Sequence, residues 1–153
     1  MGRGREYPPR PLVGVGALIH SDKKVLLIKR KFEPNKGKWS LPGGALETGE
    51  SLEDGCKREA REELGLEVRI REIFQVSEEI IPDEKGRTKF HFILIDFLAS
   101  PVGTRIVLNE ESEEFRWVTP DQAMRLDTTE NTRLIVKKFK DVFGKGRTGT
   151  TLR

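Results

Sequence analysis

The chain contains little of what disulfide-stabilised or membrane-spanning proteins need. It has one cysteine among 153 residues, Cys56, which excludes an internal disulfide and fits a small core residue. No apolar run approaches the roughly 18 residues of a membrane-spanning helix, and no charged-then-apolar leader stands at the start. Internal repeats and low-complexity blocks are also absent from the sequence. We therefore expect a cytoplasmic protein that does not enter a membrane.

Charge is plentiful but evenly mixed. Charged residues make up 35% of the chain, and the net charge of +3 rests largely on its two Gly/Arg-rich ends. Such ends are typically solvated, so we expect flexible segments at about residues 1–10 and 144–153 and do not expect a nucleic acid partner. The hydrophobic content of 35% is enough for one compact domain over residues 1–153.

The order of predicted elements indicates an α/β fold. A strand hairpin over residues 12–30 is followed by a Pro- and Gly-rich loop to residue 49 and by a helix that Ser51 opens and Gly65 closes. The remaining pattern predicts strands at 67–81 and 88–99, a short strand after an acidic loop, and helices at 120–126 and about 129–143. This order predicts an α/β/α sandwich with a mixed central sheet and differs from the Rossmann order.

The helix that Ser51 opens carries carboxylates on its apolar side. At about 100° per residue, its apolar stripe consists of Leu52, Cys56, Ala60 and Leu64. Glu63 falls inside that stripe, and Glu59 and Glu62 fall along its edge. An unpaired carboxylate moved toward low dielectric costs several kcal/mol, so a positive group must lie beside these three.

A divalent metal ion can neutralise these three carboxylates better than a single side chain can. Arg58 can serve one carboxylate but cannot neutralise three. Clustered carboxylate oxygens are hard ligands, and without a nearby histidine or cysteine they favour Mg²⁺ or Mn²⁺ over zinc. The glycines Gly43 and Gly44 precede this helix, whose N-terminus favours phosphate. The alternative for an isolated "REAREE" is a solvated charged face.

The segment from Gly44 to Leu66, "GALETGESLEDGCKREAREELGL", resembles the signature box of the Nudix hydrolases. Its fixed positions are matched by Gly44, Glu50, Arg58, Glu59, Glu62, Glu63 and Gly65. The flanking "WSLPGG" and "FRWV" extend the likeness across most of residues 12–143.

The resemblance implies a role for each matched residue. Glu59, Glu62 and Glu63 would bind the metal with the Gly44 carbonyl, Glu50 would support them, and Arg58 would orient the carboxylates. The implied reaction is hydrolysis of a phosphoanhydride, in which the metal polarises the phosphate and acidifies the attacking water. For the general base, the position of a functional glutamate in similar relatives favours Glu111 in the acidic loop "LNEESEEFRW", with Glu110 and Glu114 as alternatives. The non-catalytic interpretation is that this loop is simply solvated.

Substrate contacts are expected around the glycines. The candidates are Arg30, Lys38, Trp39 and Gly43, because a cation and an indole there could meet phosphate and base. Trp39 fits a core anchor equally, and Phe32 fits either a stacking ring or a loop plug. Gly55 suggests a close approach at the helix, whereas Asp96 fits a satisfied buried aspartate. His20 and His91 receive no role.

Four functions remain compatible with these residues. The first is cleavage of ADP-ribose or a related nucleoside diphosphate derivative to AMP and ribose 5-phosphate; relatives with this activity carry a proline near the position of Pro82, which also simply opens a turn. The others are a nucleoside triphosphate pyrophosphohydrolase that removes oxidised nucleotides, a non-catalytic nucleotide sensor and an RNA-cap hydrolase. Relatives that cleave ADP-ribose are often homodimers, which is the oligomer we would expect for the first function.

Overall fold

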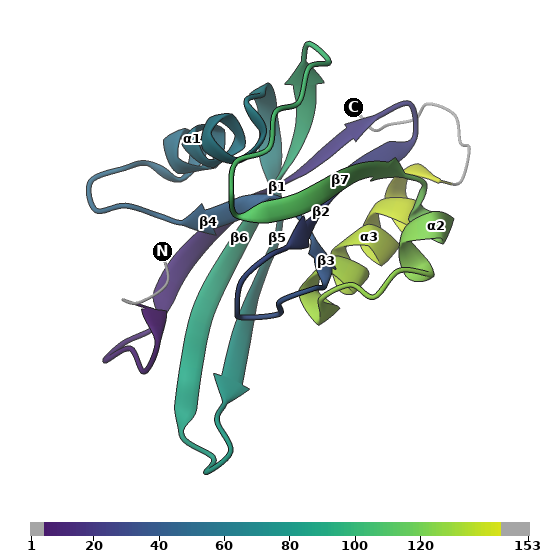
Figure 1. Cartoon of the computed structure of the whole chain (residues 1–153). Coiled ribbons are helices and arrows are strands. Elements are labelled where there is room, and N and C mark those ends of the chain that lie inside the picture. Colours follow the sequence, from purple (N-terminus) through teal and green to yellow (C-terminus); the bar gives the residue numbers. More distant parts are fainter. Residues whose placement is uncertain (1–4, 145–153) are drawn as a thin grey trace.

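A mixed β-sheet packed between helices forms the protein (Figure 1). The computed structural model describes residues 5–144. Its strands are β1 (Leu12–Ser21), β2 (Lys24–Arg30), β3 (Trp39–Ser40), β4 (Gly43–Ala45), β5 (Glu67–Pro82), β6 (Thr88–Val102) and β7 (Ser112–Val118). Its helices are α1 (Leu52–Leu64), α2 (Pro120–Met124) and α3 (Glu130–Phe143).

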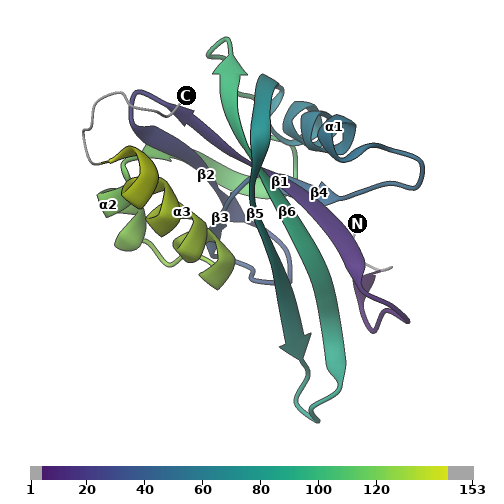
Figure 2. The ribbon, with the colours of Figure 1, turned by 180° about the vertical axis from the view of Figure 1, so that it is seen from behind.

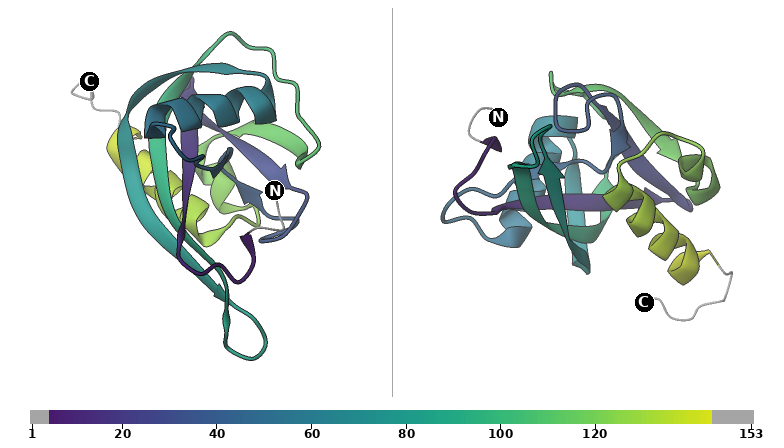
Figure 3. Two further views of the ribbon diagram at one scale, coloured as in Figure 1. Left: turned by 90° about the vertical axis from the view of Figure 1, so that its left-hand side faces the viewer. Right: turned by 90° about the horizontal axis from the view of Figure 1, so that it is seen from below.

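The strands pair in the order β3-β2-β1-β6-β5, with β4 added to β1 and β7 added to β2. The pairing of β1 with β6 is parallel, whereas those of β1 with β2, of β5 with β6 and of β2 with β7 are antiparallel. Helix α1 lies on one side of the sheet and α2 and α3 on the other, as the front, back and side views show (Figures 1, 2 and 3). The predicted α/β/α sandwich with a mixed sheet is therefore confirmed.

Alternation along β1 divides the core into two clusters, because successive side chains of a strand point to opposite faces. Val15, Ala17 and Ile19 pack in the cluster that contains the α1 residues Cys56, Ala60 and Leu64. Leu18 packs in the other cluster with α3 residues that include Ile135, Val136 and Phe139. The apolar stripe predicted for α1 is thus buried, and Cys56 is a core residue at 1% exposure.

Both predicted ends of α1 are confirmed. The Ser51 side chain accepts a hydrogen bond from the Asp54 N–H (3.1 Å), which satisfies one of the free donors of the first turn. Gly65 ends the helix in the left-handed conformation, with φ 63° and ψ 27°. Its N–H donates to the Arg61 carbonyl (2.9 Å), as in a glycine C-cap.

The segment predicted as a continuous loop between residues 32 and 49 contains two short strands, β3 and β4. Their two and three residues are too few to produce a periodic signal, and prolines and glycines surround them. Gly43 explains why β4 can pair with β1, since a Cβ at this position would lie 2.3 Å from the Val15 carbonyl oxygen. Glycine therefore allows a strand to form in a segment whose Pro- and Gly-rich composition predicts a loop.

The described part of the N-terminal segment, residues 5–10, is mostly exposed but makes contacts with the sheet. The Tyr7 N–H donates to the carbonyl of Lys89 on β6 (2.7 Å), so this part of the chain lies against the sheet. Residues 1–4 and 145–153, where flexible ends were also predicted, lie outside the described residues. Among residues 5–144, none of the helices is long and apolar enough to cross a membrane.

We predict that Gly65→Ala destabilises the protein by about 1–2 kcal/mol, because a Cβ is unfavourable in the left-handed conformation. Urea denaturation followed by circular dichroism measures this change. Glu53→Ala, in the exposed first turn of α1, serves as the control and should change stability by less than about 0.5 kcal/mol. Equal stability of Gly65→Ala and the native chain would show that the C-cap conformation carries no such constraint.

Candidate active site

The acidic side chains of α1 point in two directions, and the structure separates Glu59 from Glu62, which the helical wheel places together along the edge of the apolar stripe. Glu59 and Glu63 turn toward the sheet and are only 7% and 3% exposed. Glu62 lies on the solvent side of the same helix, with 56% of its side chain exposed. The helix therefore brings two carboxylates into the protein and leaves a third at the rim.

Arg58 joins three of the predicted site residues. Its guanidinium donates through Nε and Nη2 to the two oxygens of Glu50 (2.6 and 3.0 Å) and through Nη1 to Glu59 (2.9 Å) and Glu62 (3.2 Å). A further bond from Nη2 reaches the carbonyl of Ala45 (3.0 Å). The expectation that Arg58 serves one carboxylate is therefore too narrow, since this side chain ties the loop before α1 to the face of the helix.

The Glu63 carboxylate lies outside the reach of that network. It accepts one hydrogen bond from the Gly43 N–H (2.9 Å) and a long one from the Ser112 hydroxyl (3.5 Å). Its pKa is raised to about 8, chiefly by burial; the negative charges of Glu59 and Glu111 act in the same direction, and the Gly43 N–H and the charge of Arg30 oppose them. The hydrogen bonds described for this carboxylate therefore come from neutral donors.

Glu59 lies against the glycine bend. A Cβ on Gly44 would come within 2.6 Å of all three carboxyl atoms of Glu59, so only glycine leaves room for them. Burial raises the pKa of Glu59, and the charges of Glu62 and Glu111 act in the same direction, while Arg58 opposes them. Glu50 shows the reverse, because its hydrogen bonds from Arg58 and from the Glu47 N–H lower its pKa.

The acidic loop places Glu111 near these carboxylates. The loop is tied to the end of α1 by hydrogen bonds from the N–H of Val107 to the Leu64 carbonyl (2.8 Å) and from the N–H of Asn109 to the Glu63 carbonyl (3.3 Å). The side chain of Asn109 accepts the N–H of Glu111 (2.9 Å), which fixes the backbone there. The negative charge of Glu111 acts on both Glu59 and Glu63.

The two alternatives in this loop are placed differently. Glu110 lines the same cavity as Glu111 and Glu63. Glu114 lies on β7, where it pairs with Arg116 (3.1 Å) and lines none of the cavities described for residues 5–144. The geometry therefore favours Glu111 and Glu110 over Glu114 as groups near a substrate.

The carboxylates fit a divalent cation, although they do not form a closed cage. Among the described residues, no three acidic, histidine or cysteine side chains already stand together as metal ligands. Arg58 holds Glu59 and Glu62, and Gly43 holds Glu63, which accounts for their separation. Hard oxygen donors whose pKa values are raised by burial and mutual repulsion are nevertheless those that a hard divalent ion stabilises.

A cavity of about 380 Å³ opens over this carboxylate group. It is lined by both acidic and basic side chains, namely Glu33, Glu63, Glu110, Glu111, Arg5 and Arg30. Phe32 lines the same cavity and is 54% exposed, so it is available for stacking and does not plug the core. Acidic and basic side chains around one space are suited to a metal-bound phosphate.

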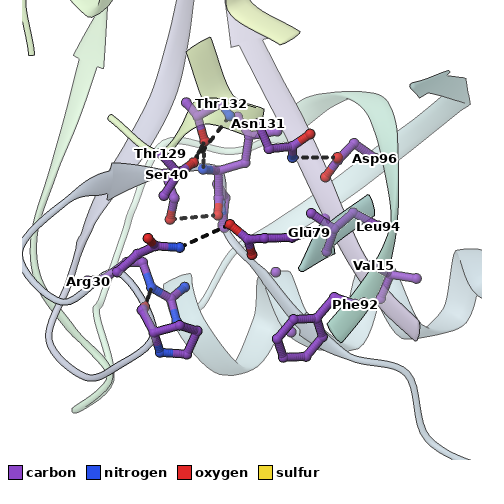
Figure 4. Close-up of a pocket in the computed structure, with 18 of the residues that line it drawn as sticks. Val15, Arg30, Ser40, Glu79, Phe92, Leu94, Asp96, Thr129, Asn131 and Thr132 are labelled. Atoms are coloured by element: carbon purple, nitrogen blue, oxygen red, sulfur yellow. Dashed lines mark hydrogen bonds between the residues drawn. The ribbon is translucent and has the colours of Figure 1, made fainter. Parts of the chain in front are cut away.

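A second cavity of about 110 Å³ lies on the α3 side of the sheet (Figure 4). Gly14 and Gly16 of β1 form its floor, and the Cβ that Gly16 lacks would lie 2.4 Å from an oxygen of Asp96. Asn131 of α3 donates to Asp96 (3.2 Å), as Figure 4 shows, and accepts from the Ser77 hydroxyl (2.6 Å). The cavity thus combines apolar residues with polar and charged side chains, several of which are held by hydrogen bonds, and such a lining is suited to a ligand.

The four predicted substrate contacts occupy different places. Arg30 lines both cavities, and its Nε donates to the Pro34 carbonyl (2.7 Å). Gly43 lines the smaller cavity, while Lys38 lines a separate groove beside the tip of the β5–β6 hairpin. Trp39 is 5% exposed and lies in the core with Arg116 stacked on its ring, so in this structure it is a core anchor.

The polar groups of the smaller cavity were not predicted as site residues. Asp96 is a satisfied buried aspartate, as expected, but it also faces the cavity, and burial raises its pKa to about 6. Asn131, which lines the cavity, and its hydrogen-bond partner Ser77 carried no signal, because each lies in an ordinary helix or strand pattern. The alternation Gly14-x-Gly16 is the one feature that could have indicated them, since two glycines on one face of a strand often mark a close approach. Gly55 marks packing of the loop, because a Cβ there would lie 2.7 Å from Leu46.

Known proteins share this arrangement. The model of the NUDIX domain matches residues 10–139. An ADP-ribose pyrophosphatase from Methanocaldococcus jannaschii is 36% identical over 104 residues, which are 68% of this chain and 59% of that protein, so the match leaves much of the relative uncovered. A nucleoside triphosphatase NudI from Escherichia coli is 30% identical over 123 residues, 76% of this chain and 87% of the relative.

Solved structures agree with the fold and the sequence match. A MutT NUDIX hydrolase from Burkholderia pseudomallei superposes with a TM-score of 0.72 at 31% identity, covering 84% of this chain and 97% of the other. A MutT protein from Methanosarcina mazei gives a TM-score of 0.72 at 29% identity, covering 90% and 98%. With a family model that spans most of the chain and with the signature carboxylates gathered on α1, this chain belongs to the NUDIX family.

Proposed function

We propose that this protein hydrolyses a phosphoanhydride bond in a nucleoside diphosphate derivative with the help of a divalent metal ion, Mg²⁺ or Mn²⁺. The observation that carries the proposal is the pair of buried carboxylates, Glu59 and Glu63, held beside Gly43 and Gly44 without a cation for each. NUDIX hydrolases generally depend on such an ion. The carboxylate oxygens of this chain have the chemistry to bind one.

The metal would be held by Glu59, Glu62 and Glu63 with the Gly44 carbonyl. When bound, the ion supplies a Lewis acid for the phosphate oxygens and lowers the pKa of the attacking water. Arg58 keeps Glu59 and Glu62 oriented, and Glu50 in turn fixes the guanidinium of Arg58 through two hydrogen bonds. Arg58 is therefore a positioning residue for the carboxylates.

The remaining chemistry falls to the cavity walls. Glu111 is the proposed general base, because it shares the cavity with Glu63 and its backbone is fixed on both sides: its N–H bonds Asn109 and its carbonyl accepts the Lys31 N–H (3.1 Å). Arg30, which lines the same cavity, would bind the phosphate oxygens through its planar guanidinium. The smaller cavity, which adjoins the larger one at Arg30, would take the nucleobase.

We propose ADP-ribose as the substrate, with AMP and ribose 5-phosphate as products. The similarity to the ADP-ribose pyrophosphatase of M. jannaschii supports this choice. Pro82, the residue associated with that activity, ends β5 at the hairpin tip. The second candidate, nucleoside triphosphate pyrophosphohydrolysis, is supported by the similarity to NudI over 87% of that relative's length. A sensor without activity is disfavoured, because every acidic position of the signature is kept.

A substrate panel with magnesium and product identification tests the proposal. AMP and ribose 5-phosphate from ADP-ribose would support the first candidate, whereas pyrophosphate released from a nucleoside triphosphate would support the second. Failure to hydrolyse any of these nucleotides with either Mg²⁺ or Mn²⁺ would overturn the enzymatic assignment.

We predict that Glu62→Gln and Glu59→Gln each lower kcat by about 10²-fold or more, since each removes a charged metal ligand but leaves the shape of the side chain. Glu53→Gln, an exposed change in the same helix, is the matched control and should keep native activity. Steady-state rates on the preferred substrate of the panel give the comparison, and circular dichroism checks the fold. Native turnover by Glu62→Gln would remove this residue from the metal site.

Glu111→Gln should lower kcat by about 10²- to 10⁴-fold while KM changes little, because the amide cannot accept the proton of the attacking water. Initial rates over a range of substrate concentrations separate the two constants. Glu114→Gln is the control, since Glu114 pairs with Arg116 away from the cavity. An unchanged kcat in Glu111→Gln would transfer the role to Glu110.

Asp96→Asn should lower kcat/KM for the preferred nucleobase by about 10- to 100-fold, because an amide presents a different set of donors and acceptors.

Asp96 also gives the stability of the native chain a defined pH dependence. The raised pKa of Asp96, about 6, means that the folded protein binds the proton more tightly than the unfolded chain does, so stability falls as pH rises from about 4 to 6. The variant should therefore be more stable than the native chain at pH 8 and lose this advantage at pH 4, as denaturant titrations would measure.

We also propose that the chain is cytoplasmic and forms a homodimer. Its one cysteine is buried, which is compatible with a reducing compartment. The exposed apolar residues Ile73, Val76 and Ile80 on β5 offer a surface for a second copy. Light scattering that gives the mass of a single 17.4 kDa chain at all concentrations would contradict the dimer, and cell fractionation tests the compartment.

A further inference from the structure

The N-terminal segment is fastened to the tip of the β5–β6 hairpin by Tyr7. Its hydroxyl donates to Asp83 (2.8 Å), and its N–H donates to the carbonyl of Lys89 (2.7 Å). Arg87 lies over the Tyr7 ring, 5.2 Å from its centroid, and also bonds Asp83 (2.9 Å). The side view shows the segment turning back beside the start of β1 (Figure 3). These contacts fix the backbone two residues beyond Arg5.

Arg5 is thereby placed between the two cavities of the site. It lines the larger cavity together with Glu63 and Glu111, and it lines the smaller cavity together with Asp96. Its guanidinium lies over the Phe92 ring, 5.8 Å from the centroid. Like Arg30, it borders both spaces, so two cations stand where the carboxylate cavity and the proposed nucleobase cavity meet.

The electrostatic surroundings of Arg5 suit an anion. Burial lowers its pKa, and the neighbouring charge of Arg30 lowers it further, whereas Glu111, Glu59 and Glu63 act in the opposite direction. A divalent metal bound to these carboxylates would cancel much of their attraction. Arg5 and Arg30, which both line the two cavities, would then present two guanidinium groups to one anionic ligand.

A diphosphate is the anionic group that fits this position. In a nucleotide substrate it lies between the base and the second moiety, and here the two arginines lie between the two cavities. We propose that Arg5 binds the diphosphate of the substrate opposite the metal, so that the N-terminal segment is a working part of the active site. Tyr7 is a positioning residue that keeps this segment in place. The inference rests on the proposed function, because it assumes a nucleoside diphosphate derivative as the ligand.

The test compares Arg5→Gln with Arg10→Gln, an exposed change in the same segment. Loss of a charge-assisted bond to phosphate should raise KM for the hydrolysed nucleotide about tenfold to hundredfold in Arg5→Gln, with kcat within a fewfold of native. Arg5→Lys should recover part of the loss, and Tyr7→Phe should raise KM by a smaller factor. Arg10→Gln should match the native protein, and thermal unfolding should be similar for all four variants.

Calorimetric titration separates this inference from the proposed function. Binding of ADP in the presence of magnesium should weaken by the same factor in Arg5→Gln, whereas binding of adenosine, which has no phosphate, should be unchanged. If the protein hydrolyses no nucleotide, the proposed function is wrong. The ADP titration then still tests whether Arg5 binds the diphosphate. Native KM and native ADP affinity in Arg5→Gln would overturn the inference. A lower KM would also overturn it, because Arg5 would then compete with the metal for the carboxylates.

Discussion

The arrangement depends on one electrostatic constraint, namely that carboxylates of α1 are turned toward the sheet. Burying a carboxylate without compensation costs several kcal/mol, and the protein meets this cost with backbone and side-chain donors. Arg58 serves Glu59, and the Gly43 N–H serves Glu63. Both interactions require the glycine bend at Gly43 and Gly44 to lie close to α1. The glycines, the short strand β4 and the tie between Arg58 and the loop follow from that requirement.

These hydrogen bonds compensate the cost of burying the two carboxylates only in part. The pKa values of Glu59 and Glu63 are both raised, so the folded chain without a metal holds negative charge at an energetic disadvantage. The divalent ion of the proposed function would relieve this disadvantage. Stability and metal binding would then be linked through the same two side chains.

The sequence is sufficient for the helix and its carboxylates because their signal is local. The 3.6-residue period places Glu63 in the apolar stripe, and the residues at the ends of the helix, Ser51 and Gly65, follow from capping preferences alone. The smaller cavity and the position of Arg5 depend on contacts between distant segments. Asn131 meets Asp96 across 35 residues, and Tyr7 meets Asp83 across 76, so neither pair leaves a periodic trace. The composition of the basic N-terminus likewise gives no sign of the Tyr7 contacts.

The glycine floor of the smaller cavity belongs to the central strand β1, whose alternate residues Val15 and Ala17 build the core under α1. Any side chain added at Gly16 would displace Asp96, and any shift of the strand to make room would disturb the packing on its other face. If the proposed nucleobase cavity changed its ligand preference during evolution, we would therefore expect the substitutions in α3 and in the loop around Asn35. Strand β1 would keep its residues, because both of its faces are packed.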